Sequence, residues 1–391
     1  MVRTGLEVLL ADRLELLQGK RVGVVANPSS VNASLEHAVD LLYRHPDVRL
    51  TTIMGPQHGA RGETQDNMIE WEDYRDPVTR LPVYSLYGKT RKPTPEMLKD
   101  VDLLIFDVQD VGARYYTFVY TMTLAMQACG ELGLEMVVLD RPNPIGGSQI
   151  EGPVLDPDYR SFVGLFPLAI RHGLTVAELA RYFSAECGVA CRLEVVPMTG
   201  WHREMYFDET GLPWIMPSPN IPTLDSAVVY PGLCLLEGTN VSEGRGTTRP
   251  FELSGAPWVD PNTLVKMLER LDLPGVTFRP VHYIPTFHKW SGTMIGGLQI
   301  HVTDRGAFRP FLTGVALIKA YRELGGEQFR WKDPPYEYEY EKWPIDILFG
   351  NATIRQQIER GDSLEQIEAG WQQELNTFAE KREKYLLYRV T

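Results

Sequence analysis

The chain has 391 residues, of which 43% are hydrophobic and 23% are charged, and its formal net charge is −12. This length is too great for one ordinary hydrophobic core, so the sequence predicts a soluble globular protein with two domains. An acidic surface repels phosphate backbones, which argues against nucleic acid as a partner.

The sequence contains no run of about 18 apolar residues, the length that spans a bilayer, so we expect no membrane insertion. Its first residues lack the pattern of a signal peptide. As given, the chain is therefore expected in the cytoplasm. It would be periplasmic or secreted if a leader had been removed.

The first half of the chain alternates between helical and strand patterns. A helix is predicted over about 4–18, followed by a β-branched run at 20–30, a helical stretch at 35–46 and an apolar run from 48. The strand pattern returns from 101 and from 134, with a helical stretch at 117–132 between them. This alternation is typical of a parallel sheet with helices on both faces.

The helix predicted at 175–187 begins with Thr175 as a plausible N-cap and Glu178 three residues later. The proline-rich segment 213–232 predicts an ordered loop.

A second pattern follows residue 255. It consists of a helix near 261–272, strands near 276–284 and 294–303, a helix at 308–323 and a helical tail over 351–385. We therefore predict a parallel-sheet domain over 1–250 and a smaller C-terminal α/β domain over 255–391.

Polar residues follow the predicted strands. They are Asn27, the pair Gln57 and His58, and the segments 107–110 and 140–143. Because ligands of open α/β sheets bind at the carboxyl ends of the strands, these loops predict a shared cleft. No G-x-G-x-x-G follows the first strand and no phosphate loop is present, so no nucleotide cofactor is expected.

No metal is expected either. Asp107, Asp110 and Asp140 resemble metal ligands only in their spacing, because sites for hard cations gather more carboxylates in one loop. The four cysteines do not form a zinc pattern.

Five segments resemble, in the same order, the hallmark segments of the exo-β-N-acetylmuramidase family, formerly the domain of unknown function 1343. They are DVQDVGARYYTF (107–118), DRPNPIGG with EGP (140–153), SFVGLFPLAIRHGLTVAELA (161–180), PSPNIPTLDSAVVYPG (217–232) and EGTNVSEGRGTTRPFE (237–252).

The resemblance covers nearly the whole chain. It implies a Rossmann-like, mostly parallel sheet domain followed by a smaller C-terminal α/β domain, with the active site in the cleft between them. It also implies a glycoside hydrolase that releases N-acetylmuramic acid from the non-reducing ends of peptidoglycan fragments, so the expected partner is a small carbohydrate.

Hydrolysis of a glycoside usually needs two carboxyl groups. The first cleft loop of the family usually resembles PEHG, whereas this chain has PQHG, and the amide of Gln57 cannot transfer a proton. We consider Glu63 and Glu70 as replacements, and Glu151 as the second carboxyl group. His58 could donate a hydrogen bond beside the reacting bond, or hold a backbone carbonyl.

Muramic acid carries a lactyl carboxylate, which a forked guanidinium can bind with two hydrogen bonds. Arg245 or Arg249 fits that task, while Glu237, Glu243 and Glu252 could orient the arginines or bind sugar hydroxyls. A network of these residues that ties the two domains together is the structural alternative, and both could hold.

The predicted substrate-binding residues are Gln57, Arg61, Asp110, Arg114, Tyr115, Asp140, Arg141, Asn143, Asn220, Glu237, Asn240, Glu243, Arg245 and Arg249. The alternative function is a protein that binds muramyl sugars or muropeptides and has lost hydrolysis, and Gln57 motivates it. A nucleotide-using enzyme is a third interpretation, but it rests on fold analogy alone.

Overall fold

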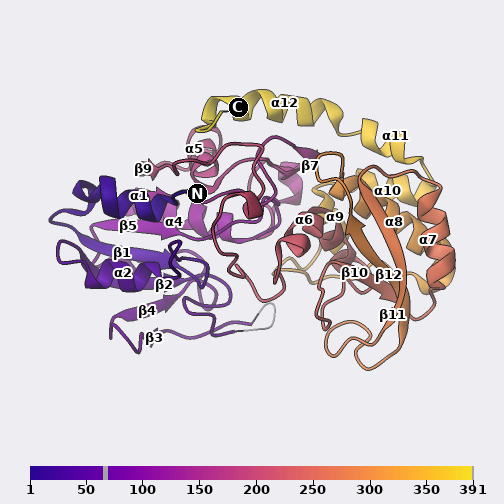
Figure 1. Ribbon diagram of the computed structural model, residues 1–391, viewed down its shortest axis with the longest axis horizontal. Coiled ribbons are helices and arrows are strands. Elements are labelled where there is room, and N and C mark those ends of the chain that lie inside the picture. Colours follow the sequence, from indigo (N-terminus) through magenta and orange to yellow (C-terminus); the bar gives the residue numbers. More distant parts are fainter. Residues whose placement is uncertain (65–68, 390–391) are drawn as a thin grey trace.

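The computed structural model describes residues 1–64 and 69–389. Its larger sheet has the strand order β3-β4-β2-β1-β5-β6-β9, and every neighbouring pair is parallel except β3 with β4 (Figure 1). The strands are β1 (Arg21–Ala26), β2 (Arg49–Gly55), β3 (Tyr74–Arg75), β4 (Pro82–Ser85), β5 (Leu103–Asp107), β6 (Glu135–Leu139) and β9 (Arg192–Val196). The mostly parallel sheet expected from the sequence is confirmed.

Helices cover both faces of this sheet. One face carries α1 (Gly5–Asp12) and α2 (Ala38–Arg44), and the other carries α4 (Phe118–Leu132) and α5 (Val176–Glu186). Strand β5 shows why, because Leu103 and Ile105 pack with the first pair of helices while Leu104 and Phe106 pack with the second. A strand buried on both sides reads as a continuous apolar run.

The predicted helices differ from the observed ones mainly at their ends. The helix expected over 4–18 stops at Asp12, and a 3-10 turn at Leu14–Leu17 follows because Arg13 leaves the helical region at φ −135°. At α5 the predicted cap is confirmed, since Thr175 and Glu178 form a reciprocal capping box.

The C-terminal region has a smaller antiparallel sheet with the order β10-β12-β11. Its strands and covering helices are β10 (Leu253–Ala256), β11 (Val276–Tyr283), β12 (Ile295–Val302), α7 (Pro261–Glu269) and α8 (Pro310–Gly325). The short remaining elements are α3 (Pro95–Leu98), the antiparallel pair β7 (Glu151–Val154) and β8 (Ala169–Arg171), and α9 (Pro344–Phe349).

Part of the loop predicted over 213–232 is a helix, so that prediction is wrong in its second half. Helix α6 (Leu224–Leu233) begins at the N-cap Thr223 and contains Pro231 near its end. It packs against α8 at two glycines: a Cβ on Gly232 would lie 1.9 Å from the carbonyl oxygen of Pro310, and one on Gly314 2.3 Å from that of Gly232. By its packing α6 therefore belongs with the C-terminal region.

The tail predicted to be helical over 351–385 is helical, and it consists of three helices, α10 (Thr353–Arg360), α11 (Leu364–Ala369) and α12 (Gln372–Arg382). Gly361 ends α10 with φ +85°, a conformation that favours glycine. Helix α12 then runs back from the C-terminal region across β7 and ends near α5 (Figure 1).

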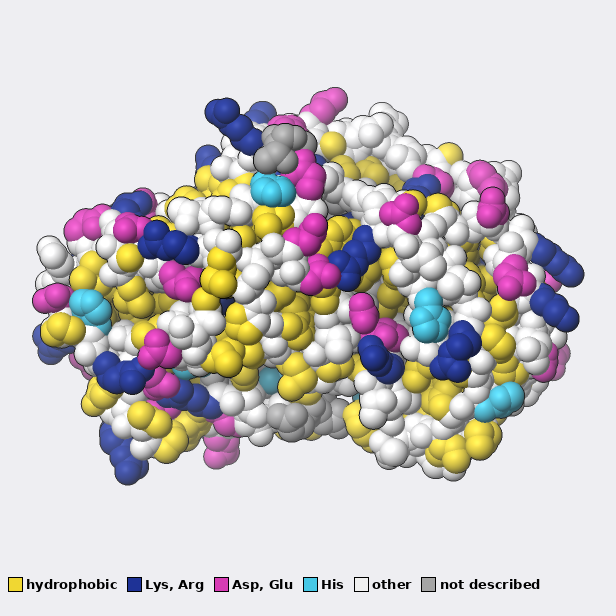
Figure 2. All heavy atoms as spheres, viewed as in Figure 1, with side chains coloured by type: hydrophobic (Ala, Val, Ile, Leu, Met, Phe, Trp, Pro, Cys, Tyr) yellow, Lys and Arg dark blue, Asp and Glu magenta, His cyan; other side chains and the backbone are white. Residues whose placement is uncertain are grey.

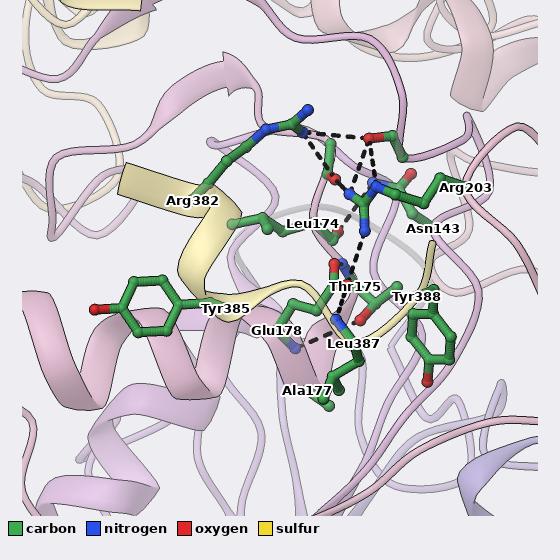
Figure 3. Close-up of polar contacts among 12 residues, drawn as sticks. Asn143, Leu174, Thr175, Ala177, Glu178, Arg203, Arg382, Tyr385, Leu387 and Tyr388 are labelled. Atoms are coloured by element: carbon green, nitrogen blue, oxygen red, sulfur yellow. Dashed lines mark hydrogen bonds and ion pairs between the residues drawn. The ribbon is translucent and has the colours of Figure 1, made fainter. Parts of the chain in front are cut away.

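The end of the tail is held by buried polar contacts on the parallel-sheet domain (Figure 3). The Arg382 guanidinium donates to the carbonyl oxygens of Gly147 (3.2 Å) and Gly173 (3.1 Å), and the Leu387 amide donates to Glu178 (2.8 Å). The segment 382–387 thus returns to the first domain.

The surface carries both signs of charge. On the face drawn in Figure 2, acidic and basic side chains are interspersed. Within 1–64 and 69–389, none of the helices has the length and apolarity needed to cross a membrane.

Candidate active site

The two regions of the chain meet at a pocket, which we name the junction pocket. Its empty volume is about 500 Å³, counting the mouth open to solvent. It is lined by Gln57, His58, Tyr115, Tyr116, Thr117, Phe118, Val163, Ser218, Asn220, Ile221, Tyr230, Glu237, Arg245, Phe251, Tyr336 and Glu337. Gln57 and His58 follow β2 of the parallel sheet, and residues 115–118 follow β5. Tyr336 and Glu337 belong to the C-terminal region.

Aromatic rings form one part of the pocket lining. The Tyr230 ring packs edge-on against Tyr116 with 5.8 Å between centroids, against Tyr115 with 5.5 Å and against Phe251 with 4.8 Å. Such ring clusters fix the orientation of each member and supply flat apolar surface. A sugar ring, which has an apolar face and a polar rim, suits a lining of this kind.

Arg245 organises the polar part of the pocket. Its Nη2 donates to Glu237 Oε1 at 2.8 Å, and its Nε lies 3.4 Å from Glu243 Oε1. Burial alone would lower the pKa of Arg245, but the two carboxylates outweigh it and hold that pKa above its ordinary value. The guanidinium is thus fixed as a cation inside the pocket.

Glu243 lies behind Arg245 and links it to Lys289. The Lys289 ammonium is 2.8 Å from Glu243 Oε2. Burial raises the pKa of this carboxyl, but Lys289 and Arg245 reverse the effect and leave it below the usual value. The polar segment 237–252 therefore builds a buried charge network and also contributes to the pocket lining.

Two carboxyl groups line the junction pocket. Glu237 accepts a hydrogen bond from the Tyr336 hydroxyl (2.7 Å) as well as from Arg245. Glu337 accepts from the Tyr87 hydroxyl (3.3 Å), and burial together with the negative charge of Glu237 raises the pKa of Glu337 to about 7. The pocket thus combines a glutamate held by cationic and hydroxyl donors with a second glutamate whose pKa lies near neutral pH.

Gln57 and His58 occupy the loop that follows β2. Gln57 Oε1 accepts a hydrogen bond from the Thr117 hydroxyl at 3.4 Å. His58 Nδ1 donates to the carbonyl oxygen of Thr64 (3.1 Å), and the backbone of His58 has φ +73°. The structure therefore gives His58 the carbonyl-holding contact, in a position that also lines the pocket.

None of the three glutamates that we predicted as catalytic lines the junction pocket. Glu63 is exposed and bonded to the hydroxyl of Tyr74, and exposed Glu70 contacts Arg91 (3.5 Å). Residues 65–68, which follow the segment of Gln57 and Glu63, lie outside the described residues.

Glu151 lies at the start of helix α8. Its two carboxylate oxygens accept hydrogen bonds from the backbone amides of Phe311 (3.1 Å) and Leu312 (2.9 Å). Burial raises the pKa of the Glu151 carboxyl, although these amides oppose the shift. This geometry is that of a helix cap.

Three of the predicted binding residues are engaged in ion pairs or backbone contacts elsewhere. Arg61 pairs with Asp40 (2.8 Å) and Asp76 (3.0 Å). Arg114 is fully buried and donates to three carbonyl oxygens, and burial lowers its pKa to about 10. Arg141 pairs with Asp107 at 2.6 Å.

The loop residues Asp110, Asp140 and Asn143 are buried in hydrogen bonds around β6 and α5. Asp110 accepts from the Gly112 amide (2.7 Å), and Asn143 donates to the carbonyl of Leu174 (3.0 Å). Asp140 caps α5 by accepting from the Ala177 amide (2.9 Å). The strand-end loops thus build a smaller hollow, lined in part by Gln109 and Arg141, apart from the junction pocket.

The remaining predicted residues divide between the pocket and its surroundings. Tyr115 and Asn220 line it, whereas Asn240 bonds to the backbone of Gln328 (2.9 Å). The side chain of Arg249 is 45% exposed and pairs with Glu252 at 3.1 Å. Of the two arginines proposed for the lactyl group, only Arg245 is in the pocket lining.

Glu337 and Tyr336 line the pocket but were not among the residues predicted from the sequence. They lie in the segment PPYEYEYE, residues 334–341, which alternates aromatic and acidic residues. That alternation after a proline pair is the signal that could have drawn attention to it. Among residues 1–64 and 69–389, no three His, Cys, Asp or Glu side chains gather as metal ligands would.

Comparisons with known proteins place the chain in a family. The family model "Exo-beta-N-acetylmuramidase NamZ, N-terminal" matches residues 22–225, and the corresponding C-terminal model matches 228–388. These two matched regions meet within α6, at residues 226–227. The domain boundary at 250–255 stays a prediction.

One curated relative is the peptidoglycan β-N-acetylmuramidase NamZ of Bacillus subtilis strain 168. It is 50% identical over 387 residues, which are 99% of this chain and 91% of the relative. A crystal structure of a DUF1343 family protein from Bacteroides fragilis NCTC 9343 matches with a TM-score of 0.90 and 38% identity, covering 99% of both chains. A second DUF1343 structure from that strain gives a TM-score of 0.77 and 29% identity, with both chains fully covered. This chain therefore belongs to the NamZ exo-β-N-acetylmuramidase family.

Proposed function

We propose that this chain is a glycoside hydrolase that releases N-acetylmuramic acid from the non-reducing ends of peptidoglycan fragments, with the junction pocket as its active site. Membership of the NamZ family and the activity named for the Bacillus subtilis relative support the reaction. The position of the active site rests on the geometry of the pocket.

The observation that carries this proposal is the pair of buried carboxyl groups, Glu237 and Glu337, in one pocket with aromatic rings. Most glycosidases use two carboxyl groups, one to protonate the leaving oxygen and one to act as base or nucleophile. A carboxyl group whose surroundings raise its pKa is suited to the role of acid. Here Arg245 and Tyr336 bind Glu237, whereas burial and the charge of Glu237 act on Glu337.

The chemistry of the pocket also suits the sugar. Arg245 brings a fixed positive charge that can attract the lactyl carboxylate of muramic acid. Tyr116 and Tyr230 offer ring surface for the pyranose. Side chains from both regions of the chain line the pocket, and small-molecule sites often lie at such junctions between domains.

The direct test is a product assay on two disaccharides. One has N-acetylmuramic acid at the non-reducing end and N-acetylglucosamine at the reducing end, and the other has the reverse order. We expect mass spectrometry to detect free N-acetylmuramic acid from the first substrate and no cleavage of the second. Cleavage of both, or of the second alone, would contradict the proposed specificity.

A second candidate function is supported by Gln57, which lines the pocket where the family usually has a glutamate. The protein would then bind muramyl sugars without hydrolysing them. Isothermal titration that detects binding of the first disaccharide, with no product over long incubation, would favour this function. In that case Gln57→Glu is expected to restore a trace of hydrolysis, because the rest of the pocket is in place.

A further inference from the structure

We propose that Glu337 is the catalytic acid of this chain, taking the role that Gln57 cannot perform. This inference rests on the proposed hydrolase function and specifies which residue supplies the proton. The assignment stands on the position of Glu337 in the junction pocket and on the groups that surround its carboxyl.

Glu337 reaches the pocket from the C-terminal region, while Gln57 reaches it from the loop after β2. Only 5% of Glu337 is exposed, yet it lines the pocket. Its Oε2 accepts a hydrogen bond from Tyr87, and the Tyr87 ring packs edge-on against Tyr338 with 6.2 Å between centroids. The carboxyl is thus held in place by a segment of the first domain.

Charged and titratable groups face Glu337 from several elements. They are Tyr87 and Arg91 from the segment after β4, Glu237 and Arg245 from the segment after α6, and Lys332 and Tyr336 from its own segment. Burial and Glu237 favour the neutral acid, whereas Tyr87, Arg245 and Arg91 favour the carboxylate, and the balance leaves the pKa of Glu337 at about 7. A general acid works best when its pKa lies near the working pH.

The other glutamates near the pocket are less suited to donate a proton. Glu243 is paired with Lys289 and Arg245, which hold its pKa below the usual value. Glu63 and Glu70 are exposed and bonded to Tyr74 and Arg91. The carboxylate of Glu151 accepts hydrogen bonds from two backbone amides at the start of α8.

The proposed step conserves protons and electrons. Glu337 gives its proton to the bridging oxygen as the bond from C1 to that oxygen breaks, and the electron pair of this bond stays on the leaving sugar. The oxygen of a water molecule forms the new bond to C1, and the proton that this water loses passes to the Glu237 carboxylate. Exchange with solvent then returns the proton from Glu237 to Glu337.

The test compares two leaving groups. A 2,4-dinitrophenyl β-N-acetylmuramide needs little acid assistance because its leaving group is stable as an anion, whereas the disaccharide needs a proton. We expect Glu337→Gln to lower kcat/KM on the disaccharide by roughly 100-fold or more. On the dinitrophenyl substrate the change should stay within a few-fold.

The pH profile gives a second readout. Parent kcat/KM on the disaccharide should fall above pH 7, because deprotonated Glu337 cannot act as acid, and this fall should be absent in Glu337→Gln on the dinitrophenyl substrate. If Glu337→Gln fails to fold, Tyr87→Phe provides the test. Loss of the Tyr87 hydroxyl removes a contact that favours the carboxylate, so the alkaline fall should move to higher pH.

The matched control is Glu341→Gln, an exposed glutamate in the same segment, which should leave both substrates unaffected. Equal losses on the two substrates, or no loss on either in a parent that is active, would overturn the role of Glu337 while leaving the hydrolase function intact. A parent that cleaves neither substrate would overturn the hydrolase function, and the role of Glu337 with it.

Discussion

The guanidinium of Arg245 pairs with the carboxylates of Glu237 and Glu243, and it also lines the junction pocket. This combination joins the two interpretations of the segment 237–252, since Arg245 is part of a buried network and is placed to meet a ligand. A guanidinium binds a carboxylate through a planar fork that lysine cannot reproduce.

Arg245→Lys should therefore weaken binding of N-acetylmuramic acid by roughly tenfold, or about 1.4 kcal/mol. Binding of N-acetylglucosamine, which lacks the lactyl group, should change much less. Isothermal titration with both sugars checks this difference, and Arg249→Lys is the matched control because Arg249 is half exposed and outside the pocket lining. Equal losses for the two sugars would exclude a contact between Arg245 and the lactyl group.

The residues of the candidate site could be predicted only in part from the sequence. Gln57, Tyr115, Asn220, Glu237 and Arg245 stand in recognisable motifs, and the structure brings them together. Glu337 could not be found in this way, because it comes from a distant segment and becomes part of the pocket only when the two regions pack. Its protonation depends on burial and on the charge of Glu237, which are properties of the folded chain.

At the scale of elements, the motif that contains Glu151 can be recognised in the sequence, but the role of this residue cannot be read from it. Glu151 was predicted to be the second catalytic carboxyl group, but in the fold its carboxylate accepts hydrogen bonds from the first free amides of α8. The fold class could be predicted because strands buried on both faces are apolar throughout. Helix α6 could not, because its burial against α8 outweighs the low helix propensity of Pro231.

Glu151→Ala tests the capping role. The variant loses two hydrogen bonds to backbone amides, so we expect the free energy of unfolding to fall by about 1–2 kcal/mol. Turnover per folded molecule on the disaccharide should stay near that of the parent, because Glu151 is outside the pocket lining. Unfolding by denaturant and a parallel assay measure the two quantities. A loss of turnover of roughly 100-fold with unchanged stability would instead make Glu151 a catalytic residue.

At the scale of the whole molecule, the C-terminal tail connects the two regions by packing against β7 and α5 (Figure 1). Tyr388 is a central contact of this tail. Its hydroxyl donates to Asp140 Oδ2 (2.5 Å) and accepts from the backbone amide of Met198 (2.7 Å). Asp140 in turn caps α5, so the tail stabilises an element of the parallel-sheet domain.

Tyr388→Phe should lower the free energy of unfolding by about 1–3 kcal/mol, because it leaves a buried oxygen of Asp140 and a backbone amide without this partner. Tyr385→Phe is the matched control from the same tail. Its hydroxyl bonds to Glu186 (2.6 Å) at an exposed position, where the loss should be small. Similar melting temperatures for the two variants would show that the tail contributes no specific stabilisation through Tyr388.

The most direct test of the active-site position is a crystal structure of this chain with N-acetylmuramic acid bound. We predict the sugar in the junction pocket, with its ring near Tyr116 and Tyr230 and its lactyl carboxylate near Arg245. The C1 end should lie between Glu237 and Glu337. Density for the sugar in the hollow lined by Gln109 and Arg141, with the junction pocket empty, would contradict both the location of the site and the roles given to its two glutamates.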